Sequence, residues 1–196
     1  MLTHLLALSV HDRYLRFGYQ ATDEQIERYV QTLDFERDEV FGVFNRRLEL
    51  IALAHLAYTP EAQVVGEPPM AEFGVSVRTD ARGRGFGRRL FEHATLHARN
   101  RGAHKLFIYA LSENAAMLRI ARNAGATVER NGSESEAWLQ LPPDTIGTQL
   151  DEMLEQHVAE MDYRWKVQLR RVDGFIEAIG EVRERLAHNG RAANEQ

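Results

Sequence analysis

Hydrophobic and polar residues show two different periodicities along the first 143 positions of the chain. Apolar residues spaced three or four apart predict helices over 22–33, 86–101 and 114–123, and a shorter helical segment over 11–18. Short apolar or alternating runs predict strands over 2–8, 39–44, 49–58, 71–78, 105–111, 127–130 and 136–141. The interleaving of both kinds of element predicts a mixed α/β domain.

Individual residues mark where some of these elements begin and end. Thr22 is placed to cap the helix that follows it, and Ser112 is the candidate for the same role before the helix over 114–123. Asn45-Arg46 is suited to a hairpin turn between two strands. Gly102 can take the left-handed conformation that often ends a helix.

Residues 144–196 have a different pattern, without a strand signal. Apolar residues recur there at heptad spacing, with only Gln168 polar in the series: Leu154, Val158, Met161, Trp165, Val172, Phe175, Ile179, Val182 and Leu186. Because one helix cannot bury such a stripe alone, we expect two chains to pair through it as a homodimer. Gly174 and Gly180 favour a broken helix or a hairpin. The predicted organisation is a domain over 1–143 and a helical extension over 144–196.

The composition excludes several kinds of site and location. The chain of 196 residues has no Cys, so it has no disulfide, no Cys-ligated zinc and no thiolate to carry an acyl group. Its longest apolar stretch, Leu50 to Tyr58, is far shorter than the ~20 residues of a membrane helix. The first ten residues lack the cationic flank of a secretory signal. We therefore expect a cytoplasmic protein with no membrane partner.

Charge is unevenly distributed along the chain. The formal net charge of -5 and the pI of about 5.9 argue against a nucleic-acid-binding protein. The segment Arg78–Lys105 nevertheless holds eight Lys or Arg residues against two acidic residues, Asp80 and Glu92. A basic segment with several glycines in an acidic protein predicts a site for a small polyanion.

The most informative part of that segment is Arg82–Arg89, which follows a predicted strand and opens a predicted helix. Its glycines let the backbone approach a ligand, and the N–H groups at a helix start bind phosphate. A P-loop needs Lys and then Ser or Thr where Arg88 and Arg89 stand, and a dinucleotide fingerprint needs a small residue in place of Arg88. Two interpretations of this segment remain: a coenzyme A site, or an arginine-rich surface turn.

The wider order of motifs resembles the GNAT superfamily of acetyl-CoA-dependent N-acyltransferases. A strand, the Arg-x-x-Gly-x-Gly turn, an amphipathic helix, a second strand, an Asn-headed helix and an Ala-Gly-Ala segment follow one another over 71–130, and the resemblance extends back to residue 2. Ala71–Val75 and Ser112–Leu118 look most like bacterial protein-lysine acetyltransferases. The resemblance implies an α/β (α+β) fold with a mixed, mostly antiparallel central sheet flanked by helices.

The resemblance also implies which residues hold acetyl-CoA. The strand ending at Val77 should diverge from the strand beginning at Lys105, with the pantetheine arm in the gap. Backbone groups of Val75 and Val77 should pair with this arm, and the Val77 N–H should polarise the thioester carbonyl as an oxyanion hole does. Asn114 should hydrogen-bond the arm as well. The pyrophosphate should lie against the backbone N–H groups of Arg82, Gly83, Arg84, Gly85, Phe86, Gly87 and Arg88.

Direct transfer to an amine needs a base, and Glu72 is the candidate, because a carboxylate on a central strand must be paired or hydrated. An ordinary ion pair at Glu72 and a catalytic role for His55 are the alternatives. Many members of the superfamily have a Tyr as general acid four residues before the glycine that ends the last helix, where this chain has Ala121. Tyr109 and Ser112 are poorer candidates for that role, and Ser112 fits a helix cap better.

These features predict an acetyl-CoA-dependent N-acetyltransferase that acts on a primary amine in a ternary complex. Small-molecule and protein amines fit alike, among them lysines, polyamines and aminoglycosides. The alternative is a non-catalytic acyl-CoA-binding module that signals through its C-terminal helices, which Ala121 favours. His93 and His97 have the spacing of a metal-binding pair, but no acidic residue completes a known zinc motif, so we expect no metal.

Overall fold

The computed structural model describes residues 1–59 and 69–142. Of the described residues, 1–43, 50–59 and 69–142 belong to one compact unit, and 44–49 belong to a second. The described part of the second unit is a turn, in which the Asn45 N–H donates to the Glu49 carbonyl at 3.0 Å, at the predicted hairpin position. None of the described helices is long and apolar enough to cross a membrane.

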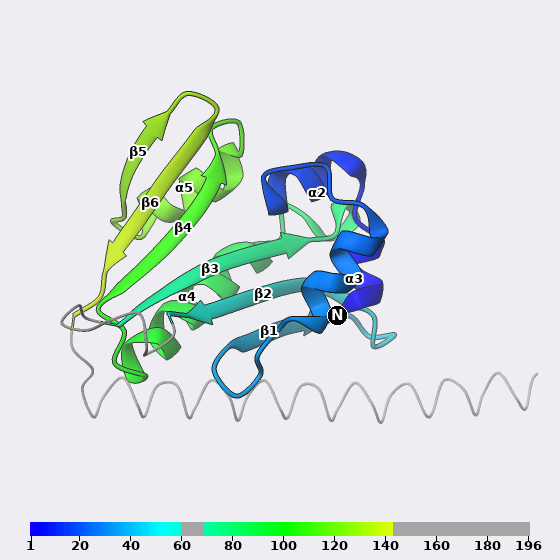
Figure 1. The fold of residues 1–196 in the computed structure, drawn as a ribbon, viewed down its shortest axis with the longest axis horizontal. Helices are drawn as coiled ribbons and strands as arrows, with labels where there is room; N and C mark the ends of the chain where they lie inside the picture. Colours follow the sequence, from blue (N-terminus) through cyan, green and yellow to red (C-terminus); the bar gives the residue numbers. More distant parts are fainter. Residues whose placement is uncertain (60–68, 143–196) are drawn as a thin grey trace, which may run out of the picture. The chain divides into compact units, whose positions relative to one another are not determined.

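A six-stranded sheet forms the centre of the fold, with the strand order β1-β2-β3-β4-β6-β5 (Figure 1). The strands are β1 (Glu39–Phe44), β2 (Leu50–Tyr58), β3 (Met70–Val77), β4 (Lys105–Leu111), β5 (Thr127–Asn131) and β6 (Glu134–Gln140). Strands β3 and β4 are parallel, whereas β2 and β3, β4 and β6, and β5 and β6 pair antiparallel. The predicted mixed, mostly antiparallel sheet is therefore confirmed.

Different helices cover the two faces of this sheet (Figure 1). The helices are α1 (Leu2–Leu6), α2 (Val10–Phe17), α3 (Asp23–Gln31), α4 (Phe86–Asn100) and α5 (Ala115–Asn123). Strand alternation in β2 assigns its side chains to the two faces. Leu53 packs with Leu5 of α1 and Ile26 of α3, whereas Ala52 and Ala54 belong to the larger cluster under α4 and α5.

The strand predicted over 2–8 is wrong, because residues Leu2–Leu6 form helix α1. A short apolar run suits either element, and here the packing partners decide: Leu5 is fully buried against α3 and β2. His4 fixes the helix to the sheet. Its Nδ1 lies 2.9 Å from the Leu50 carbonyl oxygen and its Nε2 lies 2.9 Å from Ser76 Oγ.

One of the two predicted helix caps is confirmed. Thr22 caps α3 in a reciprocal capping box with Gln25. The cap of α5 is Asn114 and not Ser112, because the Asn114 side chain accepts from the Met117 N–H at 3.2 Å. The Ser112 hydroxyl is instead used in the sheet, where it donates to the Glu134 carbonyl at 2.9 Å and ties the end of β4 to β6.

The helical extension predicted over 144–196 lies outside the described residues, and so does the pairing of two chains through it. The domain boundary at 143 therefore stays a prediction. The predicted helix over 86–101 and the glycine at its end are found in place: α4 ends at Asn100, and Gly102 follows with a φ of 77°.

Candidate functional site

Strands β3 and β4 form a wedge that opens toward the end of β3 (Figure 1). They pair through three residue pairs only, of which the last joins Glu72 to Phe107. Beyond this pair each strand continues with a different neighbour, β2 on one side and β6 on the other. The predicted divergence of the two strands is thus present, and it leaves one edge of β3 without a partner strand.

The register of β3 on β2 shows which backbone groups face the wedge. The Arg78 N–H donates to the Ile51 carbonyl at 2.9 Å, and the Thr59 N–H donates to the Met70 carbonyl at 3.0 Å. Because antiparallel pairs alternate between hydrogen-bonded and non-bonded, the even-numbered residues of β3 bond to β2. The N–H and carbonyl groups of Val75 and Val77 therefore point into the wedge.

The predicted glycine-rich turn lies at the wide end of the wedge and leads into α4. Gly83 and Gly85 have φ values of 74° and 80°, a conformation that favours glycine, and Gly85 is the N-cap of α4. A Cβ atom at either position would meet no atom within 4 Å, so the turn is open on its ligand side. Gly87 is different, since its Cβ would lie 3.4 Å from Ile120 Cδ1. A side chain at position 87 would therefore begin in ordinary contact with Ile120 and Val77.

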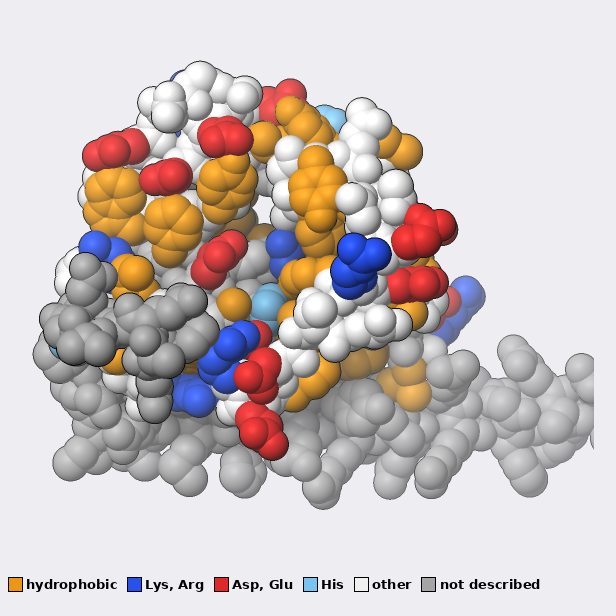
Figure 2. Space-filling model, viewed as in Figure 1, with side chains coloured by type: hydrophobic (Ala, Val, Ile, Leu, Met, Phe, Trp, Pro, Cys, Tyr) orange, Lys and Arg blue, Asp and Glu red, His pale blue; other side chains and the backbone are white. Residues whose placement is uncertain are grey.

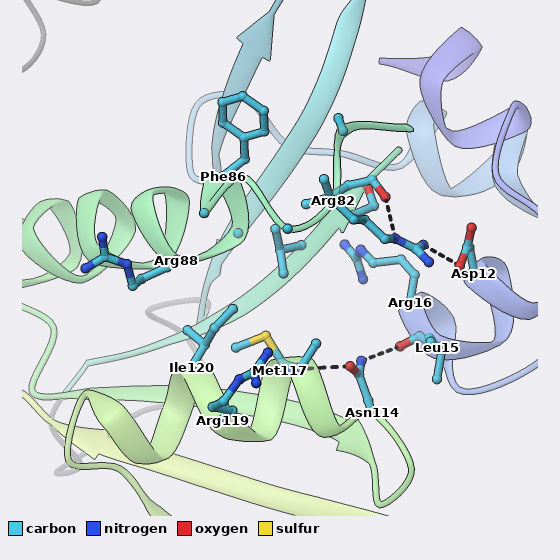
Figure 3. Close-up of a pocket in the computed structure, with 18 of the residues that line it drawn as sticks. Asp12, Leu15, Arg16, Arg82, Phe86, Arg88, Asn114, Met117, Arg119 and Ile120 are labelled. Atoms are coloured by element: carbon cyan, nitrogen blue, oxygen red, sulfur yellow. Dashed lines mark hydrogen bonds and ion pairs between the residues drawn. The ribbon is translucent and has the colours of Figure 1, made fainter. Parts of the chain in front are cut away.

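These parts enclose a cavity of about 420 Å³, which we call the wedge cavity (Figure 3). The predicted cofactor residues that line it are Val75, Val77, Arg82, Gly83, Gly85, Phe86, Gly87, Arg88 and Asn114. Arg84 does not line it, and its guanidinium lies 5.0 Å from the centre of the Phe86 ring. The sequence analysis missed the contribution of Leu8, in the turn before α2, and of two helices, whose lining residues are Asp12, Leu15, Arg16, Ala116, Met117, Arg119, Ile120 and Asn123.

Asp12 is the clearest of the missed residues. Its side chain is 5% exposed and makes an ion pair with Arg82, whose Nε also donates to the Val77 carbonyl at 3.2 Å (Figure 3). Burial alone would raise the pKa of Asp12, but the hydrogen bonds from Arg82, Ser9 and Thr79 bring it below its ordinary value. The Arg82 side chain is therefore engaged by α2 and β3, and the turn is attached to the N-terminal helices.

Asn114 lies at the opposite wall, where α5 begins. Its side chain caps α5, and its Nδ2 lies 3.5 Å from the Leu15 carbonyl oxygen of α2 (Figure 3). The amide thus spans the space between α2 and α5, at the inner end of the wedge cavity.

The hydrogen-bond donors and the apolar walls of the wedge cavity suit coenzyme A. Open backbone N–H groups at the start of α4 suit a pyrophosphate, with Arg88 and Arg119 on the lining. The unpaired edge of β3 offers the alternating donors and acceptors that a pantetheine arm with two amides requires. Apolar side chains, among them Leu8, Met117 and Ile120, complete the wall.

Glu72 lines a second, smaller cavity of about 220 Å³, which we call the Glu72 cavity. Its lining residues are Leu15, Arg16, Phe17, Tyr29, Glu72, Phe73, Gly74, Val75, Ile108, Tyr109, Asn114 and Met117. The Glu72 side chain is exposed to it on the face covered by α2 and α3. Figure 2 shows acidic, basic and histidine side chains gathered on this face, between the strands β4 and β6 and the helices α2 and α3. Leu15, Arg16, Val75, Asn114 and Met117 line both cavities, which are therefore adjacent.

His55, the alternative base, lies behind the Glu72 cavity in a buried chain of polar groups. Its Nδ1 is 2.8 Å from the Tyr29 hydroxyl, and its Nε2 is 3.4 Å from Asp38 Oδ2. Burial lowers the pKa of His55, and the charge on Arg16 lowers it further. Burial alone would raise the pKa of Asp38, but the hydrogen bonds from Arg37 and the Tyr58 N–H lower it. His55 is one of the residues that hold this face together and lines neither cavity.

The position of the superfamily's general acid is occupied by Ala121, which is fully buried in the core. Tyr109 reaches the Glu72 cavity, but its hydrogen bond to Glu134 raises the pKa of its hydroxyl to about 12, which makes it a weak acid. Ser112 lies in the sheet contact to β6 described above. His93 and His97 pack edge-on against Phe41, with ring centres 4.7 and 5.4 Å away.

Comparison with known proteins extends these observations. The model of the acetyltransferase (GNAT) family matches residues 4–126. The fold is similar to the GNAT domain of Streptomyces lividans PAT, at a TM-score of 0.58 and 21% identity, over 71% of this chain and 82% of that one. It is also similar to spermidine N-acetyltransferase from Vibrio cholerae, which was solved with CoA and spermine. The TM-score is 0.55 and the identity is 19%, over 71% of this chain and 88% of that one. A third similar structure is ribosomal-protein-alanine N-acetyltransferase from Brucella melitensis. Its TM-score is 0.52 and its identity is 21%, over 71% of this chain and 92% of that one.

Proposed function

The chain belongs to the GNAT family of acetyltransferases, whose acyl donor is acetyl-CoA, and from this premise we propose that it transfers an acetyl group to a primary amine with Glu72 as general base. The observation that carries the proposal is the position of Glu72. It lies on the strand that bounds the wedge, in a cavity that shares five lining residues with the wedge cavity. An amine that enters the Glu72 cavity would meet the base and the wedge together.

The residues of the wedge bind and orient the donor in this proposal. Acetyl-CoA supplies an activated acyl group as a thioester. The N–H groups of the turn Arg82–Arg88 hold the pyrophosphate, and the backbone of Val75 and Val77 pairs with the pantetheine arm. The Val77 N–H, which points into the wedge, donates to the thioester carbonyl, and Asn114 lies beside the arm.

In this proposal, Glu72 accepts the proton that the amine must lose. A protonated amine cannot attack a carbonyl carbon, so a proton must leave it first. Glu72 is exposed to the cavity, where it can accept that proton directly or through a water molecule. The chain has no Cys that could carry the acetyl group, which favours direct transfer in a ternary complex. Ala121 cannot protonate the departing thiolate, so we propose that the thiolate leaves without help from that position.

Two of the similar structures support an amine as the acceptor. One is named as a spermidine N-acetyltransferase and another as a ribosomal-protein-alanine N-acetyltransferase, and both names specify transfer to nitrogen. At 19% and 21% identity, these likenesses leave the particular acceptor open.

The proposal is tested by the release of free CoA. The full-length protein is mixed with acetyl-CoA and, in turn, with spermidine, lysine-rich peptides, aminoglycosides and free amino acids, and the new thiol is detected with a chromogenic reagent. We expect acceptor-dependent release for at least one amine, together with an acetylated product of the expected mass. Release at the rate of the protein-free control with every acceptor would contradict the proposal.

A second function is favoured by one observation, the buried Ala121 in place of a general acid. A non-catalytic acyl-CoA-binding module needs the wedge cavity but no proton donor. In that case, CoA and acetyl-CoA would stabilise the fold by RT ln(1 + [L]/Kd) and so raise the melting temperature, while no amine would release CoA.

A further inference from the structure

Arg16 extends from α2 toward the space between the two cavities (Figure 3). Its guanidinium lies against the backbone of β3 at Gly74, where a Cβ atom would be 2.6 Å from its Cζ and Nη2. The missing side chain of Gly74 therefore makes the space that this guanidinium fills. Any residue other than glycine at position 74 would force it away.

Within residues 1–59 and 69–142, the guanidinium is held by aromatic residues and one neutral hydrogen bond. Its Nη2 donates to the Tyr29 hydroxyl at 2.9 Å, and its Cζ lies 5.1 and 5.7 Å from the ring centres of Phe17 and Tyr29. The Tyr29 hydroxyl is in turn fixed by His55, at 2.8 Å from its Nδ1. Arg16 is thus oriented from behind by a buried chain of polar groups, which leaves its remaining N–H donors directed away from Tyr29.

Arg16 also differs from three other described arginines, each of which pairs with a carboxylate. Arg13, on the same helix, pairs with Asp23 at 2.7 Å, Arg37 pairs with Asp38 at 2.8 Å, and Arg82 pairs with Asp12. No carboxylate of the described residues lies within 4 Å of the Arg16 guanidinium. A guanidinium is a rigid fork that matches a carboxylate through two parallel hydrogen bonds. Arg16 has this recognition group in place, and no carboxylate among the described residues pairs with it.

The position of Arg16 relative to Glu72 suggests what the partner is. Gly74 and Glu72 are two residues apart on β3, so both face the Glu72 cavity and their Cα atoms are ~6.6 Å apart. The Arg16 guanidinium over Gly74 and the Glu72 side chain therefore belong to the same wall of one small cavity. A small acceptor that has both an amine and a carboxylate can present one group to each of them.

We propose that Arg16 binds the carboxylate of the acceptor while Glu72 receives its amine, so that the acceptor is a free amino acid. This inference rests on the proposed function for the role of Glu72. It also accounts for a cavity of only about 220 Å³, which has room for a small molecule between Phe17, Tyr29 and Tyr109. A polyamine or a lysine side chain has no anionic group to place on Arg16.

The test compares each amino acid with the amine that lacks only its carboxylate. Alanine is paired with ethylamine, phenylalanine with phenethylamine and lysine with cadaverine. Binding to the protein saturated with CoA is measured by calorimetry, and turnover with acetyl-CoA is measured separately. The variants are Arg16→Gln, Arg16→Lys and, as a matched control, Arg28→Gln, which removes an exposed arginine of α3 that lines neither cavity.

We expect at least one amino acid to bind the wild-type protein roughly 10- to 100-fold more tightly than its paired amine, as for a charge-assisted, bidentate contact. Arg16→Gln should abolish that preference, Arg16→Lys should restore part of it, and Arg28→Gln should keep it. Equal binding of both members of every pair, a preference that survives Arg16→Gln, or no measurable binding by any amino acid would each overturn the inference. If the preference is present but no acceptor releases CoA, the proposed function fails while the Arg16 site stands.

Discussion

The wedge cavity and the Glu72 cavity adjoin each other but are built from different groups. The wedge cavity presents backbone: the open edge of β3 at Val75 and Val77 and the glycine turn before α4. The Glu72 cavity presents side chains from five separate parts of the chain, among them Arg16, Tyr29 and Glu72. Backbone groups can bind a constant donor, whereas side chains can be exchanged to suit a particular acceptor. The predictions below probe this division of roles.

The largest effect should come from Glu72→Gln, which keeps the shape of the side chain and removes its basicity. Loss of a general base typically costs ~10²–10⁴-fold in rate. We expect kcat to fall by that order near neutral pH while CoA affinity, measured by calorimetry, stays within about twofold. Activity should recover at high pH, where the amine loses its proton to solvent.

Glu27→Gln is the matched control, because Glu27 is exposed on α3 and lines neither cavity. A Glu72→Gln variant with wild-type kcat would remove Glu72 from the mechanism. A parallel loss of CoA binding would instead place Glu72 in the wedge cavity and contradict the division between the two.

The wedge cavity should be disabled by Gly85→Glu, with a loss of CoA affinity on the order of 100-fold, which equals about 2.7 kcal/mol. The new carboxylate would stand at the start of α4, where the phosphates are expected, and repel them. It would not clash with the protein itself, since nothing lies within 4 Å of a Cβ atom at this position.

Gly132→Glu is the control for backbone strain. Gly132 also has a positive φ, 62°, and open space around it, but it lies in the turn between β5 and β6. Both variants should lose stability to a similar degree, and only Gly85→Glu should lose CoA. Equal CoA affinity in the two variants would refute the pyrophosphate assignment.

The contrast between the cavities also explains what could be predicted from the sequence. The glycine turn and the strand before it are contiguous in sequence, because backbone recognition needs a run of neighbouring residues. From that run the sequence predicts Val75, Val77 and the turn as parts of the cofactor site. The side-chain contact of Arg84 could not be predicted, because a sequence does not tell which arginine of a run stacks on its neighbour, here Phe86. The role of its backbone N–H stays a prediction.

The residues from α2 and from the turn before it were missed for a different reason. The run over 2–8 is too short to distinguish a helix from a strand by periodicity, and periodicity does not show which part of the sheet the next helix packs against. Asp12 and Arg16 reach the cavities only because α2 packs beside β3. Their one signal was chemical: an acid and a base four residues apart, which is also an ordinary pattern on a helix surface.

Asp12→Asn should have an intermediate effect, because Asp12 connects α2 to the turn of the wedge cavity. We expect the free energy of unfolding to fall by about 1–2 kcal/mol, less than for a fully buried pair, since Arg82 is 45% exposed. With Arg82 released from α2, CoA affinity should fall by roughly 3- to 10-fold. Urea unfolding and calorimetry measure the two effects. Unchanged CoA affinity in a destabilised variant would show that the turn is ordered without α2.

The smallest effect concerns the pH dependence of stability, and it separates the N-terminal helices from the rest of the fold. Burial lowers the pKa of His4 below its ordinary value of 6.5. Its Nδ1–H donates to the Leu50 carbonyl and its Nε2 accepts from the Ser76 hydroxyl, an arrangement that needs the neutral ring. Above pH 6.5 the ring is neutral in both folded and unfolded chains, so it adds no pH dependence there. As the pH falls below 6.5, the unfolded chain takes up the proton first, and stability is lost until the folded chain is protonated as well.

His4→Gln tests this by keeping one hydrogen-bonding group while removing the titration. We expect it to lower the melting temperature at pH 7, because one of the two buried contacts is lost. We also expect it to flatten the decline of the melting temperature between pH 7 and pH 5, relative to the wild type and to a His11→Asn control, in which an exposed histidine of α2 is removed. His55, whose pKa burial also lowers, should account for part of the slope that persists. An identical slope in His4→Gln and the wild type would show that the pKa of His4 does not differ between the folded and unfolded chains.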